Sequence, residues 1–344
     1  MIKMSVTIND IAERVGMATS TVSRALNGSY GVHPKTIEKV QKAAAELGYV
    51  PNLGAKQLVT RKSGLVGVFV PEFSFESIRD ADDVLPSVRK ALRLYHKDML
   101  IFSVPFYDYQ PNSLNEWVHK RNLEGCLFLQ PFSKDHPIMK DALKLKVPSV
   151  NLGSSLGPKC SLVASDDYEG GKMAGAFLAA QGHSVIGYVN GPVELEICKE
   201  RYRGFCEGLK AAGVEHDASL VETGNFSGAS GKMAAAALLQ KSSQLTAICC
   251  ANDLMAMGAL LELYNNSISV PKDISVMGYD GTYFSEYTTP PLTTVRHNYE
   301  AIGIRAADLL MELMNGGSGK SVRYKPELII RDSVGHPNRK ISKD

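Results

Sequence analysis

The chain has 344 residues, of which 44% are hydrophobic and 22% are charged, and its formal net charge is +2. This length is too great for one ordinary hydrophobic core, so we expect two or three domains of a soluble globular protein. No apolar stretch of about 18 residues is present and the first residues lack a signal-peptide pattern. The sequence therefore excludes a membrane-spanning class and predicts a cytoplasmic protein.

The six cysteines indicate neither a metal site nor a disulfide framework. They include no Cys-x-x-Cys pair, and no histidine stands beside them at the spacing of metal ligands. We therefore expect buried, reduced thiols and neither a metal nor a cofactor.

Residues 7–27 have the pattern of a helix-turn-helix. A first helix is predicted over residues 8–15, because Thr7 is a suitable N-cap and apolar residues recur at i, i+3, i+4 and i+7 from Ile8. Gly16 allows the turn that follows, and the next helix would bury Val22 and Leu26. The outward face of that second helix consists of Thr19, Ser20, Ser23 and Arg24.

The charge of this segment favours nucleic-acid binding. Up to Lys62 the chain has nine lysines and arginines against four acids, a net charge of +5, so the remainder carries −3. Helix-turn-helix pairs also occur in many folds that touch no DNA. A cationic excess in the same segment is what attraction to phosphates requires.

A third helix and a linker follow. The helix is predicted to begin at Pro34, which fits the first position of a helix, and to present an apolar face that includes Ile37 and Val40. Residues 51–62 then read as a linker. Within the linker, residues 55–58 favour a helix but offer only isolated apolar side chains, so such a helix would need a partner.

From Leu65 the sequence changes to short apolar runs that alternate with helical stretches. Strands buried on both faces are predicted at residues 65–71, 98–104, 125–129, 148–152, 185–189, 247–251 and 274–279. Helices are predicted over residues 84–95, 170–181, 200–212, 231–240 and 254–264. This alternation predicts an α/β fold with two doubly wound parallel sheets and a ligand cleft at the carboxyl ends of their strands.

Four residues follow predicted strands or lie at helix starts, where such a cleft would be. Arg201, Asn252 and Asp280 could match the donors and acceptors of sugar hydroxyls. Phe226 lies in a loop where an exposed aromatic has no core to join, and it could stack on the apolar face of a pyranose. Each of the polar residues could instead be a helix cap or part of a loop salt bridge.

Two motifs have the spacing of catalytic loops without the required context. Residues 153–157 fit the Gly-x-Ser-x-Gly of a nucleophile elbow, but Pro158 stands where the helix should begin. Residues 316–321 are similar to a phosphate-binding loop, but Met314 replaces the first glycine and a helix precedes them. Asp280 alone supplies no acid and base pair, so no enzymatic activity is predicted.

Four short motifs carry a family resemblance. They are Thr7-Ile8-x-Asp10-Ile11-Ala12, Val15-Gly16, Ser20-Thr21-Val22-Ser23-Arg24-Ala25-Leu26-Asn27 and Leu47-Gly48-Tyr49-x-Pro51-Asn52. Together they resemble the head of the lactose-repressor (LacI/GalR) family of bacterial transcription regulators, and a weaker similarity extends to about residue 335. The resemblance implies an all-α headpiece over residues 1–51, a hinge over residues 52–62, a two-lobed periplasmic-binding-protein-like core over residues 63–336 and a tail over residues 337–344. Lobe 1 would contain residues 63–164 and 296–323, and lobe 2 would contain residues 165–295 and 324–336.

The resemblance also implies roles for individual residues. DNA bases would be read in the major groove by Thr19, Ser20 and Arg24, the last pairing bidentately with guanine. DNA phosphates would be held by Thr7, Thr21, Asn27 and Tyr49. The minor groove would be entered by Lys56 and Leu58, with Leu58 as the wedge. The effector would be contacted by Arg201, Phe226, Asn252 and Asp280.

These observations predict a homodimeric transcription regulator, acting as a repressor, that binds a near-palindromic operator under the control of a small carbohydrate ligand. A sugar-binding carrier without DNA function is the alternative, and a partner protein could also replace the small molecule. Three features depart from the family's usual sequence. Ala18 replaces a serine cap, Gly153 replaces an acid, and the segment that holds Phe73 and Phe75 lacks the usual motif.

Overall fold

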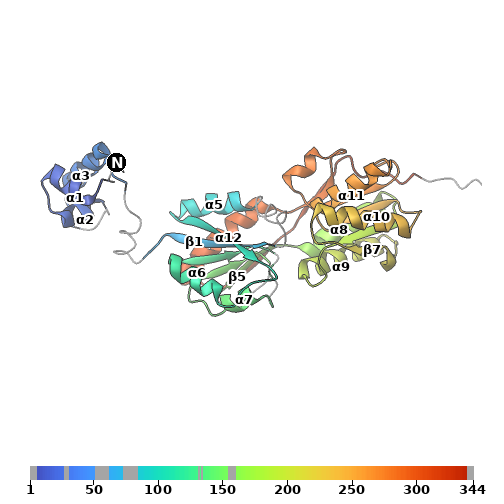
Figure 1. The fold of residues 1–344 in the computed structure, drawn as a ribbon, viewed down its shortest axis with the longest axis horizontal. Helices are drawn as coiled ribbons and strands as arrows, with labels where there is room; N and C mark the ends of the chain where they lie inside the picture. Colours follow the sequence, from blue (N-terminus) through green and yellow to red (C-terminus); the bar gives the residue numbers. More distant parts are fainter. Residues whose placement is uncertain are drawn as a thin grey trace, which may run out of the picture. The chain divides into compact units, whose positions relative to one another are not determined.

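The computed structural model of the chain describes residues 6–26, 31–50, 62–72, 84–130, 132, 135–153 and 160–338. Contacts divide the chain into two compact units, Met1–Ser63 and Gly64–Asp344 (Figure 1). Within the described residues, no helix is long and apolar enough to cross a membrane.

The described residues of the first unit form a bundle of three helices, α1 (Ile8–Val15), α2 (Thr19–Leu26) and α3 (Pro34–Leu47). All three confirm the helices predicted from the sequence. Gly16 ends α1 in the left-handed conformation with φ of 69°, as the turn requires. Ile11, Val22 and Val40 are fully buried where the three helices meet. Ala25 is buried together with Val22. Leu26 was predicted to be buried as well, but it is only partly buried.

In the part of the second unit that the structure describes there are two sheets of six strands. In the first sheet every pair of neighbouring strands is parallel, in the order β11-β5-β4-β3-β1-β2. Its strands are β1 (Leu65–Glu72), β2 (Asp98–Pro105), β3 (Gly125–Phe128), β4 (Ser149–Asn151), β5 (Cys160–Ser165) and β11 (Ser321–Tyr324). Its helices are α5 (Leu85–Leu94), α6 (Ser113–Arg121), α7 (Pro137–Ala142) and α12 (Tyr299–Met314). We call this sheet with its helices lobe 1.

Alternation along β1 explains the layers of lobe 1. Val66, Val68 and Val70 pack in one cluster with residues of α5 and α12. Phe69 points to the other face, where its cluster includes Leu114 of α6 and others from α7. Figure 1 shows α5 and α6 on opposite sides of β1. Each face of the sheet is therefore covered by helices, as in a doubly wound fold.

The second sheet has the order β12-β10-β9-β8-β6-β7 and is parallel except at β12, which runs antiparallel to β10. Its strands are β6 (Ile186–Asn190), β7 (Val221–Thr223), β8 (Ala247–Cys250), β9 (Ser275–Asp280), β10 (Thr293–Arg296) and β12 (Glu327–Ile329). Its helices are α8 (Asp167–Ala180), α9 (Glu196–Ala211), α10 (Gly228–Lys241) and α11 (Asp253–Asn265), with the short η3 (Tyr283–Tyr287). We call this part lobe 2. The two parallel-dominated sheets confirm the predicted α/β fold class.

The chain passes between the lobes three times. It leaves lobe 1 after β5, returns after β10 into α12, and crosses again between β11 and β12. Residues 316–320, the apparent phosphate loop, connect helix α12 to strand β11. A phosphate loop requires the reverse order, strand before helix, so the order of elements here does not fit a phosphate loop.

Helices α8 and α9 pack so closely that glycine is required at their contact. A Cβ atom on Gly204 would lie 2.0 Å from the carbonyl oxygen of Tyr168, and one on Gly171 would lie 2.0 Å from that of Arg201. We expect Gly204→Ala to lower the free energy of unfolding of lobe 2 by about 1–3 kcal/mol, because the two backbones would have to separate. Urea unfolding measures this change.

Gly228→Ala is the matched control. Gly228 begins α10, and the nearest atom to a Cβ placed there is 3.5 Å away, so the methyl group fits. This substitution should change the free energy of unfolding by less than about 1 kcal/mol, because the methyl group fits and alanine restricts the unfolded chain. Equal losses of unfolding free energy in Gly204→Ala and Gly228→Ala would show that the close packing of α8 and α9 is not the reason for glycine at position 204.

Candidate functional site

Helix α2 carries the predicted base-reading residues on its exposed side. Thr19, Ser20 and Arg24 are exposed, whereas Val22 and Ala25 on the opposite side are buried in the bundle. The side chain of Arg24 has no hydrogen-bond or ion-pair partner among the described residues, so its guanidinium is available to an external acceptor. A short polar face with one such cation can enter the major groove of DNA.

The predicted phosphate contacts occupy different environments. The Thr7 hydroxyl donates to an Asp10 carboxylate oxygen at 2.7 Å, and the Thr7 backbone N–H donates to the same oxygen at 2.6 Å. These hydrogen bonds hold the pKa of the Asp10 carboxyl below its usual value. Thr21 is partly buried on α2, and the Tyr49 ring packs on the bundle core. The remaining predicted DNA contacts, Asn27, Lys56 and Leu58, lie outside the described residues, as do Phe73 and Phe75.

In lobe 2, Arg201 is the centre of a buried charged cluster. Its side chain is on α9, and the residue is only 3% exposed. The guanidinium Nε donates to Asp167 Oδ1 at 2.8 Å, and Nη1 lies 2.6 Å from the Ala251 carbonyl oxygen and 3.1 Å from Asp280 Oδ1. Burial lowers the pKa of Arg201, but Asp167 and Asp280 more than offset it, so the pKa lies above its usual value. Arg201 therefore stays charged and holds α8, α9 and β9 together.

Asp280 is held in a strained turn at the carboxyl end of β9. Its backbone has φ of 105°, a conformation that residues other than glycine rarely adopt. Asp253 on α11 accepts a hydrogen bond from the backbone N–H of Thr282, two residues after Asp280, at 2.7 Å, and another from the Thr294 hydroxyl of β10 at 2.6 Å. These two hydrogen bonds tie the segment after Asp280 to α11 and β10. They thus fix the direction in which the Asp280 side chain meets Arg201.

Burial raises the pKa of Asp253 to about 7, and nearby Asp280 acts in the same direction. The pKa of an aspartate carboxyl in the unfolded chain is about 3.9. Between about pH 4 and 7 the folded protein then keeps a proton that the unfolded chain has lost, so its free energy of unfolding should fall as pH rises, by up to about 1.4 kcal/mol per pH unit. Urea unfolding at several pH values measures this slope. Asp253→Asn should reduce it, and an unchanged slope in that variant would contradict the assignment.

Asn252 and Phe226 are also joined within lobe 2. The Asn252 side chain caps α11 by accepting from the Met255 N–H at 2.9 Å, and its amide donates to the Phe226 carbonyl oxygen at 3.0 Å. The prediction that Phe226 is exposed is wrong, because the residue is 7% exposed and belongs to the lobe core. A φ of 67° at Phe226 turns its ring inward, toward Gly191 and Cys198.

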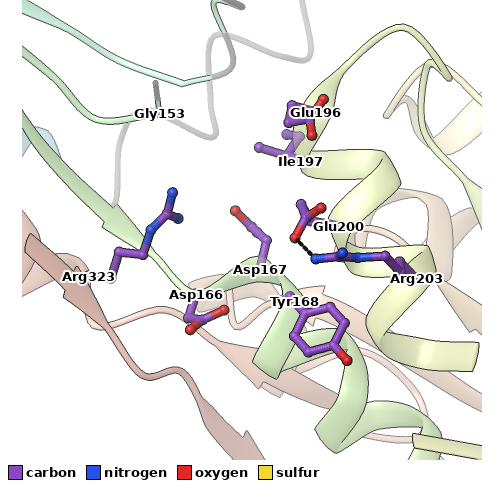
Figure 2. Close-up of a pocket in the computed structure, with 9 residues that line it drawn as sticks. All are labelled: Gly153, Asp166, Asp167, Tyr168, Glu196, Ile197, Glu200, Arg203 and Arg323. Carbon is purple, nitrogen blue, oxygen red and sulfur yellow. Dashed lines mark hydrogen bonds and ion pairs between the residues drawn. The ribbon is translucent and has the colours of Figure 1, made fainter. Parts of the chain in front are cut away.

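A cavity of about 400 Å³ is lined by residues of both lobes (Figure 2). Lobe 1 contributes Gly153 after β4 and Arg323 in β11. Lobe 2 contributes the start of α8 and one side of α9, through Asp166, Asp167, Tyr168, Glu196, Ile197, Glu200 and Arg203. None of the four predicted effector residues lines this cavity, but Asp167 does, and Asp167 accepts the hydrogen bond from Arg201.

Sequence reasoning missed Asp167 and His297 as members of the site. Asp167 follows β5, and His297 follows β10, where its Nε2 lies 3.2 Å from Arg201 Nη2. Neither strand was predicted, so nothing in the sequence marked these residues as lying at strand ends. An arginine as deeply buried as Arg201 requires acceptors. That requirement explains the position of Asp167, but it becomes visible only once the structure shows that Arg201 is buried.

A helix-turn-helix unit followed by two parallel-sheet lobes with a ligand-sized cavity at their junction defines the class of ligand-responsive DNA-binding regulators. Residues 7–52 match the model for bacterial regulatory proteins of the lacI family, and residues 176–334 match that for a periplasmic binding protein-like domain. The chain belongs to the lacI family, which confirms the resemblance found in the sequence.

Relatives match along nearly the whole chain. The HTH-type transcriptional regulator CelR of Thermobifida fusca is 32% identical over 333 residues, which cover 95% of this chain and 98% of that protein. The solved Lac repressor dimer bound to operator and the anti-inducer ONPF is 26% identical, with a TM-score of 0.83, and covers 96% of this chain and 99% of its own. The structure of a CelR–cellobiose complex is 31% identical, with a TM-score of 0.73, and the match covers 95% of this chain and 99% of that one. These relatives are regulators rather than enzymes, and the chain is accordingly a DNA-binding transcription regulator.

Proposed function

We propose that the chain is a homodimeric repressor that binds a near-palindromic operator and changes its operator affinity when a small carbohydrate binds between the lobes. The observation that carries the DNA-binding part is the exposed polar face of α2, whose Arg24 has no side-chain partner among the described residues, in a segment of net charge +5. The relatives favour this function over that of a sugar-binding carrier, because one is a repressor bound to operator and another is a regulator bound to cellobiose. Such a function would place the protein in the cytoplasm with the DNA.

For DNA recognition we assign residues 1–51 to the headpiece and residues 52–62 to the hinge. Bases would be read by Thr19, Ser20 and Arg24, and phosphates would be held by Thr7, Thr21, Asn27 and Tyr49. To donate to a phosphate, the Thr7 hydroxyl would have to release Asp10, because a hydroxyl has a single proton. The hinge residues Lys56 and Leu58 would enter the minor groove at the operator centre.

For effector binding we assign residues 63–336 to the core, with Arg201, Phe226, Asn252 and Asp280 at the ligand. Arg201, Asn252 and Asp280 supply donors and acceptors for sugar hydroxyls. Because Phe226 is buried, its ring would meet a sugar only at the edge of the lobe core. A ligand that contacts both lobes would stabilise one arrangement of the three crossovers and so shift the population that is competent to bind DNA.

Exposed apolar side chains on lobe 2 support dimerisation. Leu261 and Tyr264 on α11 and Tyr283, Phe284 and Tyr287 on η3 are each more than half exposed. Exposed apolar surface of this kind is typical of an interaction site, and a symmetric dimer would bury the same patch on each of its two subunits. Sedimentation velocity of the full chain tests the assignment, and a monomer at micromolar concentration would contradict it.

Selection from a random duplex library with the full-length chain tests the operator. A homodimer should enrich a near-palindromic sequence whose half-sites are related by two-fold symmetry. Enrichment of a single half-site would contradict the dimeric mode of binding, and a lack of any enrichment would contradict sequence-specific recognition by α2.

A further inference from the structure

The amino end of the lobe 1 sheet carries a group of exposed bases. The segments that lead into β1, β2, β3 and β4 meet there, because neighbouring strands of this sheet are parallel. These four strands are neighbours about 4.8 Å apart, so the starts of the outermost two are separated by about 15 Å. The segments are residues 62–64, 93–98, 121–124 and 143–148. We call their exposed lysines and arginines the basic rim, which consists of Lys62, Arg93, Arg121, Lys144 and Lys146.

Most of the charge of the basic rim is available to an external partner. Three of its members have no ion-pair partner among the described residues, namely Arg93, Arg121 and Lys146. Lys144 lies 3.7 Å from Asp141, but 65% of the lysine side chain is accessible. Lys97 lies at the same end of the sheet and is not part of the rim, because it is largely buried in an ion pair with Glu124.

The carboxyl end of the same sheet has the opposite charge. Four acids lie at or just after strand ends there, namely Glu72, Asp108, Asp166 and Asp167. The bases described at this end are Arg323 and Lys325, and Lys325 is paired with Glu169 at 3.3 Å. The residues beyond Lys62 have a net charge of −3, so the basic rim is a local exception within the core.

Helix dipoles alone do not explain the basic rim. Helices in both lobes end at the amino edge of their sheet, where a cation stabilises the negative end of a helix. The corresponding edge of lobe 2 nevertheless balances its bases with acids. Its exposed lysines, at positions 210, 241 and 272, are matched by three exposed acids, Glu215, Asp217 and Asp273. In the four segments of lobe 1, Asp98 is the one exposed acid among the described residues. The excess of positive charge therefore belongs to lobe 1 and not to the fold.

The linker joins lobe 1 at the basic rim. Residues 62–64 lead directly into β1, and the Gly64 backbone N–H donates to Glu124 Oε1 at 2.7 Å, which anchors this end of the linker. DNA held by the headpiece is therefore tethered to the basic end of lobe 1 and not to the acidic end. Residues 52–62 span at most about 40 Å when fully extended, so the flanks of a bound duplex are within reach of the rim.

We propose that the basic rim is a second DNA-binding surface, which contacts phosphates on the flanks of the operator. Exposed lysines and arginines attract phosphates and release their counterions, but they read no base in doing so. The rim would therefore strengthen binding to long duplexes whatever their flanking sequence. This proposal goes beyond the function proposed above, which assigns the DNA contacts to the headpiece and the hinge alone.

Affinity for selected operator duplexes with short and long flanks tests the proposal. The flanks are about 2 and about 15 base pairs on each side, and fluorescence anisotropy of the full-length chain measures binding over a range of salt concentrations. At about 0.1 M salt, the long flanks should strengthen binding by the unaltered chain about 5-fold or more. A variant with Arg121→Gln, Lys144→Gln and Lys146→Gln should lose this gain. On the long duplex, its slope of log affinity against log salt should be shallower by about 1 to 3.

A triple variant of lobe 2 is the matched control. Lys210→Gln, Lys241→Gln and Lys272→Gln remove the same charge from the amino end of the other sheet, and Lys241, like Lys144, belongs to an ion pair. The control should keep the gain in affinity from long flanks. If both triple variants lost the gain equally, or if neither lost it, the proposal would be overturned.

An acidic protein is the other macromolecule that a basic surface could bind, and polyglutamate is the probe for it. If the unaltered chain bound polyglutamate, the rim variant did not, and long flanks gave no gain, the rim would be a protein-binding surface and the proposal would be overturned. Operator binding without any gain from long flanks would overturn this inference alone. Failure to bind any duplex would contradict the proposed function as well.

Discussion

Arg24→Ala should weaken operator binding by about 1–3 kcal/mol, or roughly 5- to 150-fold, and should relax the sequence preference at one base position in each half-site. The reason is geometric. Arg24 is exposed on the polar side of α2 and has no partner among the described residues, so its planar guanidinium can pair with both O6 and N7 of a guanine. Fluorescence anisotropy with the selected operator and with single-base variants measures both effects.

Arg14→Ala is the control for the loss of charge. Arg14 is an exposed arginine of α1 that lies 3.6 Å from Glu46, so removing it changes the net charge of the same unit by the same amount. It should weaken binding to all duplexes alike and leave the base preference intact. If Arg24→Ala and Arg14→Ala had the same uniform effect, Arg24 would be a phosphate contact and not a base-reading residue.

Arg201→Ala should lower the free energy of unfolding by about 3–5 kcal/mol and abolish the response to effector. The substitution would leave Asp167 and Asp280 buried without their cation, and uncompensated buried charge is among the costliest changes that a protein core can undergo. Arg201→Lys keeps the charge but cannot span the same partners, so we expect an intermediate loss. Urea unfolding of the full chain measures stability.

Arg203→Ala is the matched control on the same helix. Arg203 is two residues further along α9, and its ion pair with Glu200 is solvent-exposed, with 65% of the arginine side chain accessible. Pairs of this kind contribute about 1 kcal/mol or less. Similar losses in Arg201→Ala and Arg203→Ala would contradict the structural role given to the Arg201 cluster.

Much of the fold could be predicted because the sequence patterns that mark its helices and central strands lie within each element. Caps and apolar spacing define α1, α2 and α3. The central strands, such as β1 and β8, are apolar on both faces and so appear as unbroken runs. Three of the four edge strands, β7, β11 and β12, have only three or four residues and are half exposed, which leaves no such run. Their pairing depends on partners far away in the sequence, which periodicity cannot reveal.

The candidate site was partly predictable for the same reason. Asn252 and Asp280 directly follow predicted strands, so their position at the carboxyl ends of the sheet could be predicted. Asp167 and His297 follow β5 and β10, whose mixed serine and threonine content hid the strands. The inward turn of Phe226 depends on a left-handed backbone at a residue other than glycine, which the sequence does not indicate.

The central claim is that this chain binds specific DNA under the control of a small ligand. The most direct test is a salt titration of its binding to the DNA upstream of its own gene and to random duplex, with and without each member of a panel of sugars and sugar phosphates. We predict steep salt dependence on both duplexes, tighter binding to the upstream DNA and a change in that preference with one member of the panel. Weak binding without preference, even at low salt, would contradict the account.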